Sequence, residues 1–179
     1  MIKKGETLPQ HPDISLWLDS YNDIFSDFDP RATEVRAISV DFLDEAKRAA
    51  VDKDEGLALN LLVPKGKRDR KSEPIIEHRL RNHFERHHKI LKKETRTLIR
   101  TGVLFVLAGV LIMAIAAYVL VNYEGKTVLA SFLLILLEPA GWFFFWEGLD
   151  IIIFKPKDKK AELSFYKKLS HAKINFSSY

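Results

Sequence analysis

Cysteine is absent from the 179 residues of this chain. The sequence therefore has no disulfide framework, no thiolate nucleophile and no cysteine-based zinc or iron–sulfur site. The motifs of the commonest enzyme chemistries are also missing, because there is no P-loop, no glycine-rich dinucleotide turn, no GxSxG and no HExxH. We therefore expect neither enzymatic activity nor a bound cofactor.

The N-terminal stretch, MIKKGETLPQHPD, lacks an apolar segment. A cleavable signal peptide needs an apolar core of about 7–15 residues behind its basic start. We therefore expect that the first element to enter a membrane lies further along the chain.

Two long apolar runs are present instead. Residues 101–123 carry no charged side chain, and as a helix they would extend about 34 Å, enough for a bilayer core of roughly 30 Å. The second run, residues 127–154, follows after only Glu124, Gly125 and Lys126. The sequence predicts an antiparallel transmembrane hairpin over residues 98–154, with spans near 98–122 and 127–152.

Basic residues flank the hairpin at its two outer ends, whereas the connecting turn has only Lys126. The positive-inside rule then places both termini in the cytoplasm of a multi-pass protein in the cell (inner) membrane. Interfacial residues expected to contact anionic headgroups are Lys89, Lys92, Lys93, Arg96, Arg100, Lys155, Lys157 and Trp146. Because these charges gather beside the spans and not in an aromatic-interleaved patch, we expect no nucleic-acid binding.

Periodic patterns outside the hairpin predict a small cytoplasmic α+β domain. Its N-terminal part, residues 1–97, should hold strands near 13–20 and 57–63 and helices near 40–52 and 74–97. A C-terminal helix and strand in residues 155–179 should complete the sheet, since both tails emerge on the same side. No strong helix breaker precedes the first span, so the helix that begins near residue 74 should continue into it.

Two local features of this domain are also predicted. Ser39 is the expected cap of the helix that begins at Val40. Phe25 and Phe28 interrupt a stretch rich in Asp, Asn and Ser, and we expect both rings to fold back onto the domain.

Small residues recur every seven positions in both spans. They are Gly102, Gly109 and Ala116 in the first and Gly141 and Gly148 in the second. Seven residues make nearly two helical turns, so each set lines one stripe along which helix backbones can approach closely in lipid. We expect this close packing to occur within the hairpin or between subunits.

Glu138 lies deep inside the second apolar run, where a carboxylate is expensive. It is either protonated and hydrogen-bonded to a backbone carbonyl freed by Pro139, or it faces other subunits, or it lines an ion or proton path. Glu147 and Asp150 lie near the inner end of the span. We expect them to form interfacial ion pairs with Arg96 and Arg100, with cation entry as the alternative.

Metal ligation has only weak candidates. His83 and His87 have the i, i+4 spacing of a metal clamp without a completing carboxylate, and Asp23, Asp27 and Asp29 lack the pattern of an EF-hand. We expect no metal site, a solvated basic helix around the histidines, and turn or capping roles for the aspartates.

The function expected from these features is a homo-oligomeric, membrane-anchored scaffold or sensor, whose cytoplasmic domain binds an unknown partner. One alternative is a small oligomeric ion or proton channel with Glu138 in its pore. A weaker alternative is a metal-dependent membrane effector or enzyme.

Overall fold

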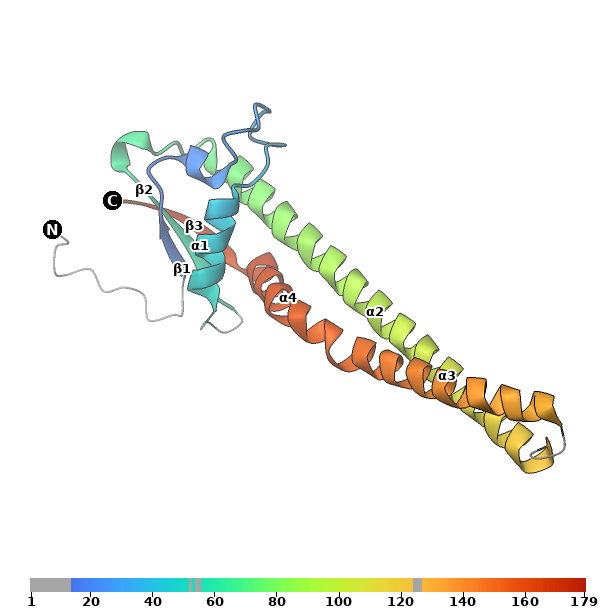
Figure 1. The fold of residues 1–179 in the computed structure, drawn as a ribbon. Coiled ribbons are helices and arrows are strands. Elements are labelled where there is room, and N and C mark those ends of the chain that lie inside the picture. The colour runs from blue at the N-terminus through green and yellow to red at the C-terminus, as the bar shows by residue number, and fades with distance from the viewer. Residues whose placement is uncertain (1–13, 52, 54–55, 124–126) are drawn as a thin grey trace. The chain divides into compact units, whose positions relative to one another are not determined.

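The computed structural model describes residues 14–51, 53, 56–123 and 127–179. The elements follow in the order β1 (Ile14–Trp17), η1 (Tyr21–Ile24), α1 (Val40–Ala50), β2 (Ala58–Val63), η2 (Lys65–Lys67), α2 (Glu73–Tyr123), α3 (Val128–Ile153), α4 (Lys155–His171) and β3 (Lys173–Ser178) (Figure 1). The fold is mostly helical, with two long apolar helices and one small sheet of three strands.

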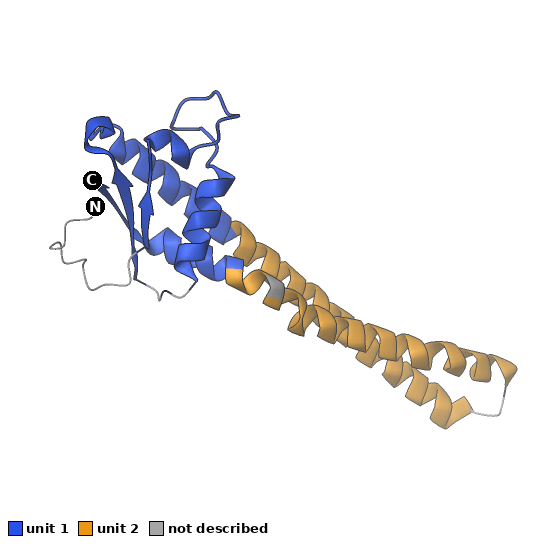
Figure 2. Cartoon of the chain, turned by 60° about the vertical axis from the view of Figure 1, so that its left-hand side comes forward, with its two compact units in different colours: residues 1–89, 162–179 blue, residues 90–161 orange. Residues whose placement is uncertain are grey.

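The chain divides into two compact units, shown in different colours in Figure 2. Unit 1 comprises the chain up to Lys89 together with Glu162–Tyr179, and unit 2 is Ile90–Ala161. The boundaries predicted from the sequence were 97/98 and 154/155. Unit 2 therefore takes in about three helical turns of charged chain before the first apolar run and about two after the second.

The sheet of unit 1 is parallel throughout, with strand order β1-β2-β3. Leu59 at the centre pairs with Ile14 on one side and with Ile174 on the other. The predicted strands are confirmed, and the C-terminal strand does join the N-terminal sheet. Parallel pairing of the strands was not predicted. Because the strands are parallel, each connection between them crosses over through helices, whereas an α+β fold keeps its strands and helices in separate parts of the chain.

Helices cover one face of this sheet. Both crossovers step in the same direction, and right-handed crossovers of that kind bring their helices to the same face. Burial agrees, because Leu59, Leu61 and Val63 of β2 are buried whereas Asn60 and Leu62 between them are only half-buried. On the less buried face the Asn175 side chain donates a hydrogen bond to Asn60 Oδ1 at 3.0 Å.

The core of unit 1 lies between the sheet and its helices. In α2 the buried residues Ile76, Leu80 and Phe84 recur every four positions and form one apolar stripe. The α4 residues Phe165 and Leu169 are also buried, and α1 contributes a shorter apolar stripe. Segments from both ends of the chain therefore share one core.

Glu73, the first residue of α2, connects four segments of unit 1. Its carboxylate accepts hydrogen bonds from Arg68 Nε at 2.7 Å and from the Tyr21 hydroxyl at 3.0 Å. Arg68 also donates to the carbonyl of Phe176 in β3 at 3.0 Å. The bond from Arg68 holds the pKa of Glu73 below its ordinary value. This network fixes the start of α2 against η1 and β3.

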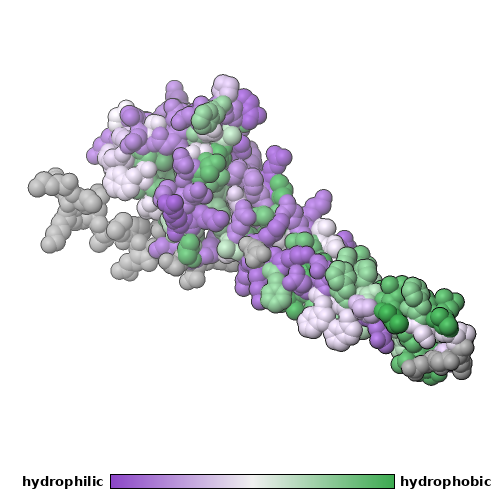
Figure 3. Space-filling view, in the orientation of Figure 1, coloured by the Kyte–Doolittle hydropathy of each residue, from purple (hydrophilic) through white to green (hydrophobic). Residues whose placement is uncertain are grey.

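Helix α2 is continuous from Glu73 to Tyr123, which confirms that the domain helix and the first apolar run form one element. Helix α3 carries the second run and contains Pro139. Both helices are long and apolar enough to cross a membrane. In unit 2, apolar side chains gather over α3 and the second half of α2 (Figure 3).

Two local predictions hold only in part. Ser39 occupies the position before α1, but its side chain forms no capping hydrogen bond; the cap with a complete capping box is Ser20, which serves η1. Phe25 is buried as expected, whereas Phe28 is 98% exposed because it lies in a turn that points away from the core. Asp13, Asp52 and Glu124 to Lys126, at the edges of predicted elements, lie outside the described residues.

Candidate functional site

Glycines lie where the two helices of unit 2 pack against each other. A Cβ atom on Gly109 would lie 2.6 Å from the backbone nitrogen of Phe145, and one on Gly148 would lie 2.6 Å from that of Val106. These distances are too short for any side chain, so the backbones touch only because glycine is present. At Gly102 a Cβ would lie 2.9 Å from the carbonyl oxygen of Gly148, whereas at Gly141 it would first meet the flexible side chain of Met113, with the nearest backbone atom at 3.2 Å. The pairing is antiparallel and lies within one chain, and the stripe ends at the buried Ala116.

Glu138 is exposed on the surface of unit 2, beside the end of this glycine contact that is marked by Met113 and Ala116. It lines an open groove of about 590 Å³ together with Met113, Ala116, Ala117, Leu120, Pro139 and Trp142. Its carboxylate forms no hydrogen bond or ion pair with another described residue. The groove therefore presents one acidic side chain on an otherwise apolar surface.

Glu147 forms an ion pair, with its carboxylate 3.2 Å from Nζ of Lys155. The predicted partners were Arg96 and Arg100. A lysine takes this role because Lys155 begins α4 directly after the turn at Phe154, on the same side of the chain as Glu147. Glu147 and Asp150 line a separate groove from that of Glu138. The three acidic residues do not share a single groove.

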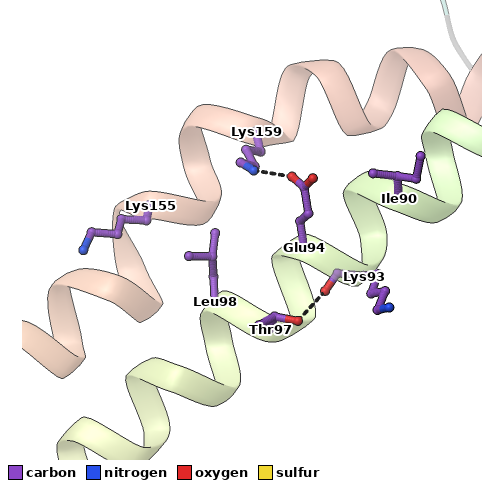
Figure 4. A pocket seen from close by; sticks show the side chains of 7 residues that line it. All are labelled: Ile90, Lys93, Glu94, Thr97, Leu98, Lys155 and Lys159. Atoms are coloured by element: carbon purple, nitrogen blue, oxygen red, sulfur yellow. Dashed lines mark hydrogen bonds and ion pairs between the residues drawn. The ribbon is translucent and has the colours of Figure 1, made fainter.

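A third groove, of about 800 Å³, lies just before the start of the first apolar run and just after the end of the second. We call it the lysine groove, and its lining residues are Ile90, Lys93, Glu94, Thr97, Leu98, Lys155 and Lys159 (Figure 4). Ile90, Glu94 and Leu98 are spaced by four residues and project from α2 toward the returning helix. Glu94 accepts a hydrogen bond from Lys159 across the groove.

Sequence reasoning identified Lys93 and Lys155 as interfacial residues but missed Glu94, Leu98 and Lys159. The available signal was the four-residue spacing of Ile90, Glu94 and Leu98, matched by that of Lys155 and Lys159. Only the antiparallel pairing of the two helices brings these stripes opposite each other. Arg96, Arg100, Lys92 and Lys157 are exposed outside the groove.

The histidines of α2 pack in unit 1. The rings of His83 and His87 lie 4.3 Å apart, and His87 stacks on Tyr166 of α4 at 5.1 Å. Nε2 of His83 is buried and has no hydrogen-bond partner among the described residues. The described part of the chain contains no group of three metal-ligating side chains. The prediction of a solvated helix face fails for His83, because α4 covers it.

His83 should make the stability of unit 1 depend on pH. Burial, then His87, Arg79 and Arg86, lower the pKa of His83 from 6.5 to about 4. As the pH falls below 6.5, His83 binds a proton in the unfolded chain but not in the folded chain. The contribution of His83 to stability is therefore full above pH 6.5 and falls as the pH drops toward 4. Allowing for partial exposure, we expect a loss of about 1 kcal/mol between pH 7 and pH 5.

Hydrogen exchange of the β2 and β3 amides in the full-length protein measures this loss. His83→Phe should remove most of the pH dependence, whereas His78→Phe, at an exposed position of the same helix, should keep it. Tyr166 of α4 contacts both histidine rings, and Glu162 of α4 and Asp44 of α1 act in turn on Tyr166. An unchanged pH profile in His83→Phe would assign the effect to one of these groups.

The aspartates of the N-terminal loop have the turn and capping roles expected of them. Asp23 accepts hydrogen bonds from the backbone nitrogens of Asp19 and Ser20. Asp29 is bound by Arg31 at 2.8 Å and by the backbone nitrogen of Ala37, which hold its pKa far below the ordinary value. Asp27 forms an exposed ion pair with Arg36.

Comparison with family models, with curated proteins and with solved structures finds no match for this chain.

Proposed function

We propose that this chain is an integral membrane protein that crosses the cell (inner) membrane twice and associates with copies of itself. Unit 1 would be its cytoplasmic scaffold or sensor domain, and it would bind a partner there. The observation that carries the proposal is the outward surface of unit 2. Only 11% of each apolar window is buried, and side chains such as Val121, Leu129 and Ile135 are 67–82% exposed. Water disfavours so much apolar surface, whereas a bilayer accommodates it.

The charged residues support the orientation. Lysine and arginine occur on α2 before the first apolar run and on α4 after the second. A membrane boundary near Thr101 and Phe154 would leave both sets in the cytoplasm, where anionic lipids attract them. Unit 1 would then lie in the cytoplasm with both chain termini.

Glu138 supports self-association. In a bilayer, its groove would expose a carboxyl group to hydrocarbon, which costs several kcal/mol in simple transfer terms. The small, exposed side chain of Ala117 leaves room at the groove for another helix to approach. A second copy that covers this groove would remove Glu138 from lipid.

Cysteine scanning tests the proposal directly, because the natural chain provides a cysteine-free background. Ala117→Cys lies in the Glu138 groove, and Ile115→Cys lies two residues away on the opposite, exposed side of α2. In native membranes we expect oxidation to link Ala117→Cys chains into dimers and to leave Ile115→Cys chains unlinked. Equal crosslinking at both sites, or none at either, would contradict self-association through this groove.

Membrane insertion needs its own measurement. The protein should stay with the membrane fraction after alkaline extraction. Tags at both ends of the chain should become accessible to a labelling reagent only after the membrane is permeabilised. Release into the soluble fraction, or ends accessible from opposite sides, would overturn the two-span proposal.

The exposed position of Glu138 also favours a second candidate, an oligomeric ion or proton channel. If Glu138 lines the pore, purified protein in liposomes should conduct, and Glu138→Gln should reduce the flux at least about tenfold, since the titrating group is lost. Background flux in both proteins would remove the channel and leave the scaffold.

A further inference from the structure

We propose that the lysine groove is a specific site for an anionic phospholipid, whose phosphate is held by Lys159 and whose first acyl carbons lie against Leu98, with Lys93 adding positive charge to the groove. This inference rests on the proposed membrane insertion of unit 2.

The position of the groove is the first argument. It lies entirely within unit 2, between the last turns of α2 before Thr101 and the first turns of α4 after Phe154. In a two-span protein this is the level of the headgroups on the cytoplasmic side. From Ile90 to Leu98 the α2 wall is about 12 Å long, which matches a phospholipid headgroup with its glycerol.

The chemistry of the lining is the second argument. Three lysines and one glutamate give the groove a net charge of +2, while Ile90 and Leu98 supply apolar surface. A phospholipid combines these same two properties, because an anionic phosphate is attached to a hydrocarbon chain. The combination is less suited to free phosphate, which would leave the apolar wall uncovered. Basic grooves beside transmembrane helices on the cytoplasmic side recognise anionic lipids in this way.

The Glu94–Lys159 pair is the third argument, and it gives the site a built-in competitor. Figure 4 shows the Glu94 carboxylate and the Lys159 ammonium meeting between the two helices, whereas the side chains of Lys93 and Lys155 point away from this pair. An incoming phosphate would have to displace or share Lys159 with Glu94. Lys155 is already engaged by Glu147 at 3.2 Å. Glu94 should therefore oppose binding while Lys159 and Lys93 favour it.

Two charge variants should consequently have opposite effects. We expect Lys159→Gln to lower the affinity for phosphatidylglycerol about fivefold, and Glu94→Gln to raise it by a similar factor. Lys160→Gln is the matched control, because it removes the same charge from an exposed position of the same helix outside the groove. Its affinity should change less than about twofold, because exposed charges are screened. Lys159→Arg keeps the charge and should restore most of the binding.

The measurement is native mass spectrometry of the full-length protein in detergent. Phosphatidylglycerol is compared with phosphatidylcholine, and the soluble headgroup glycerophosphoglycerol is added as a competitor. Selective phosphatidylglycerol binding that the soluble headgroup does not displace would support the lipid site. Displacement by the soluble headgroup would mean a phosphate site without lipid specificity, and would overturn the proposal.

Further results would also overturn it. If Lys160→Gln and Lys159→Gln weaken binding equally, the attraction belongs to the whole basic surface and not to the groove. If Glu94→Gln weakens binding, the ion pair builds the site and does not compete with the lipid. If alkaline extraction releases the protein from the membrane, the proposed membrane function is itself wrong. If the protein stays in the membrane but binds both lipids with equal affinity, only the proposed lipid site is wrong.

Discussion

Gly109→Leu should separate the two helices of unit 2. The shortest distance from a Cβ at this position is 2.6 Å, to a backbone nitrogen of α3, with the Gly141 carbonyl at 2.9 Å. Backbone atoms cannot rotate away as a flexible side chain can, so the helices must move apart. Overpacking of well-packed cores typically costs about 1–3 kcal/mol, and we expect about 3 kcal/mol here because the obstacle is the backbone itself.

The unfolding free energy of unit 2 in mixed micelles measures this effect, with the distance between the helices followed by resonance energy transfer. Ala114→Leu is the control, because Ala114 is exposed on the same helix. We expect a change under about 0.5 kcal/mol for this surface position. If Gly109→Leu and Ala114→Leu behave alike, the glycine stripe does not hold the hairpin together.

The glycine contact illustrates what the sequence alone can predict. Seven-residue spacing identified Gly102, Gly109, Gly141 and Gly148 as a packing stripe, because helical periodicity is a local property. The spacing left open whether the stripe serves one chain or two. Only the backbone of the paired helices places Gly109 against Phe145 of the same chain. Glu138 then lies outside the contact, which its position in the sequence did not reveal.

The direction of the strands in the sheet is a feature that the sequence alone could not predict. The alternating patterns of β1, β2 and β3 predicted the strands, but their direction depends on connections far apart in the chain. Asn60 pairs with Asn175, 115 residues later. Half-buried alternation is typical of antiparallel sheets. It occurs in this parallel sheet because both crossovers lie on one face and leave the other open.

The missed groove residues have a similar explanation. Lys159 and Glu94 lie 65 residues apart and meet only through the return of the hairpin. In the sequence, each belongs to a run of charges that membrane topology alone would account for. His83 was judged to be solvated for a related reason, since α4, which covers it, comes from the far end of the chain.

Phe84→Ala should have the largest effect on unit 1. Phe84 is 0% exposed, and its ring lies 6.2 Å from that of Phe165 and 6.4 Å from that of Tyr166. These contacts join α2, from the middle of the chain, to α4, near its end. Truncation of a buried phenylalanine costs about 3–5 kcal/mol through lost burial and the cavity that remains. Because domains are stable by only about 5–15 kcal/mol, unit 1 would lose a large share of its stability.

Hydrogen exchange of peptides from β2 and β3 in the full-length protein provides the measurement. We expect exchange of these strands to accelerate strongly in Phe84→Ala, because β3 is held in the sheet partly through the packing of α4 on α2. Phe28→Ala removes the same side chain from a position that is 98% exposed, so its exchange should match that of the natural protein. Equal protection in both variants would mean that β3 is held by its strand pairing alone. Unit 1 would then not depend on a core shared by the two ends of the chain, and the contact between α2 and α4 would have no structural role in the proposed scaffold.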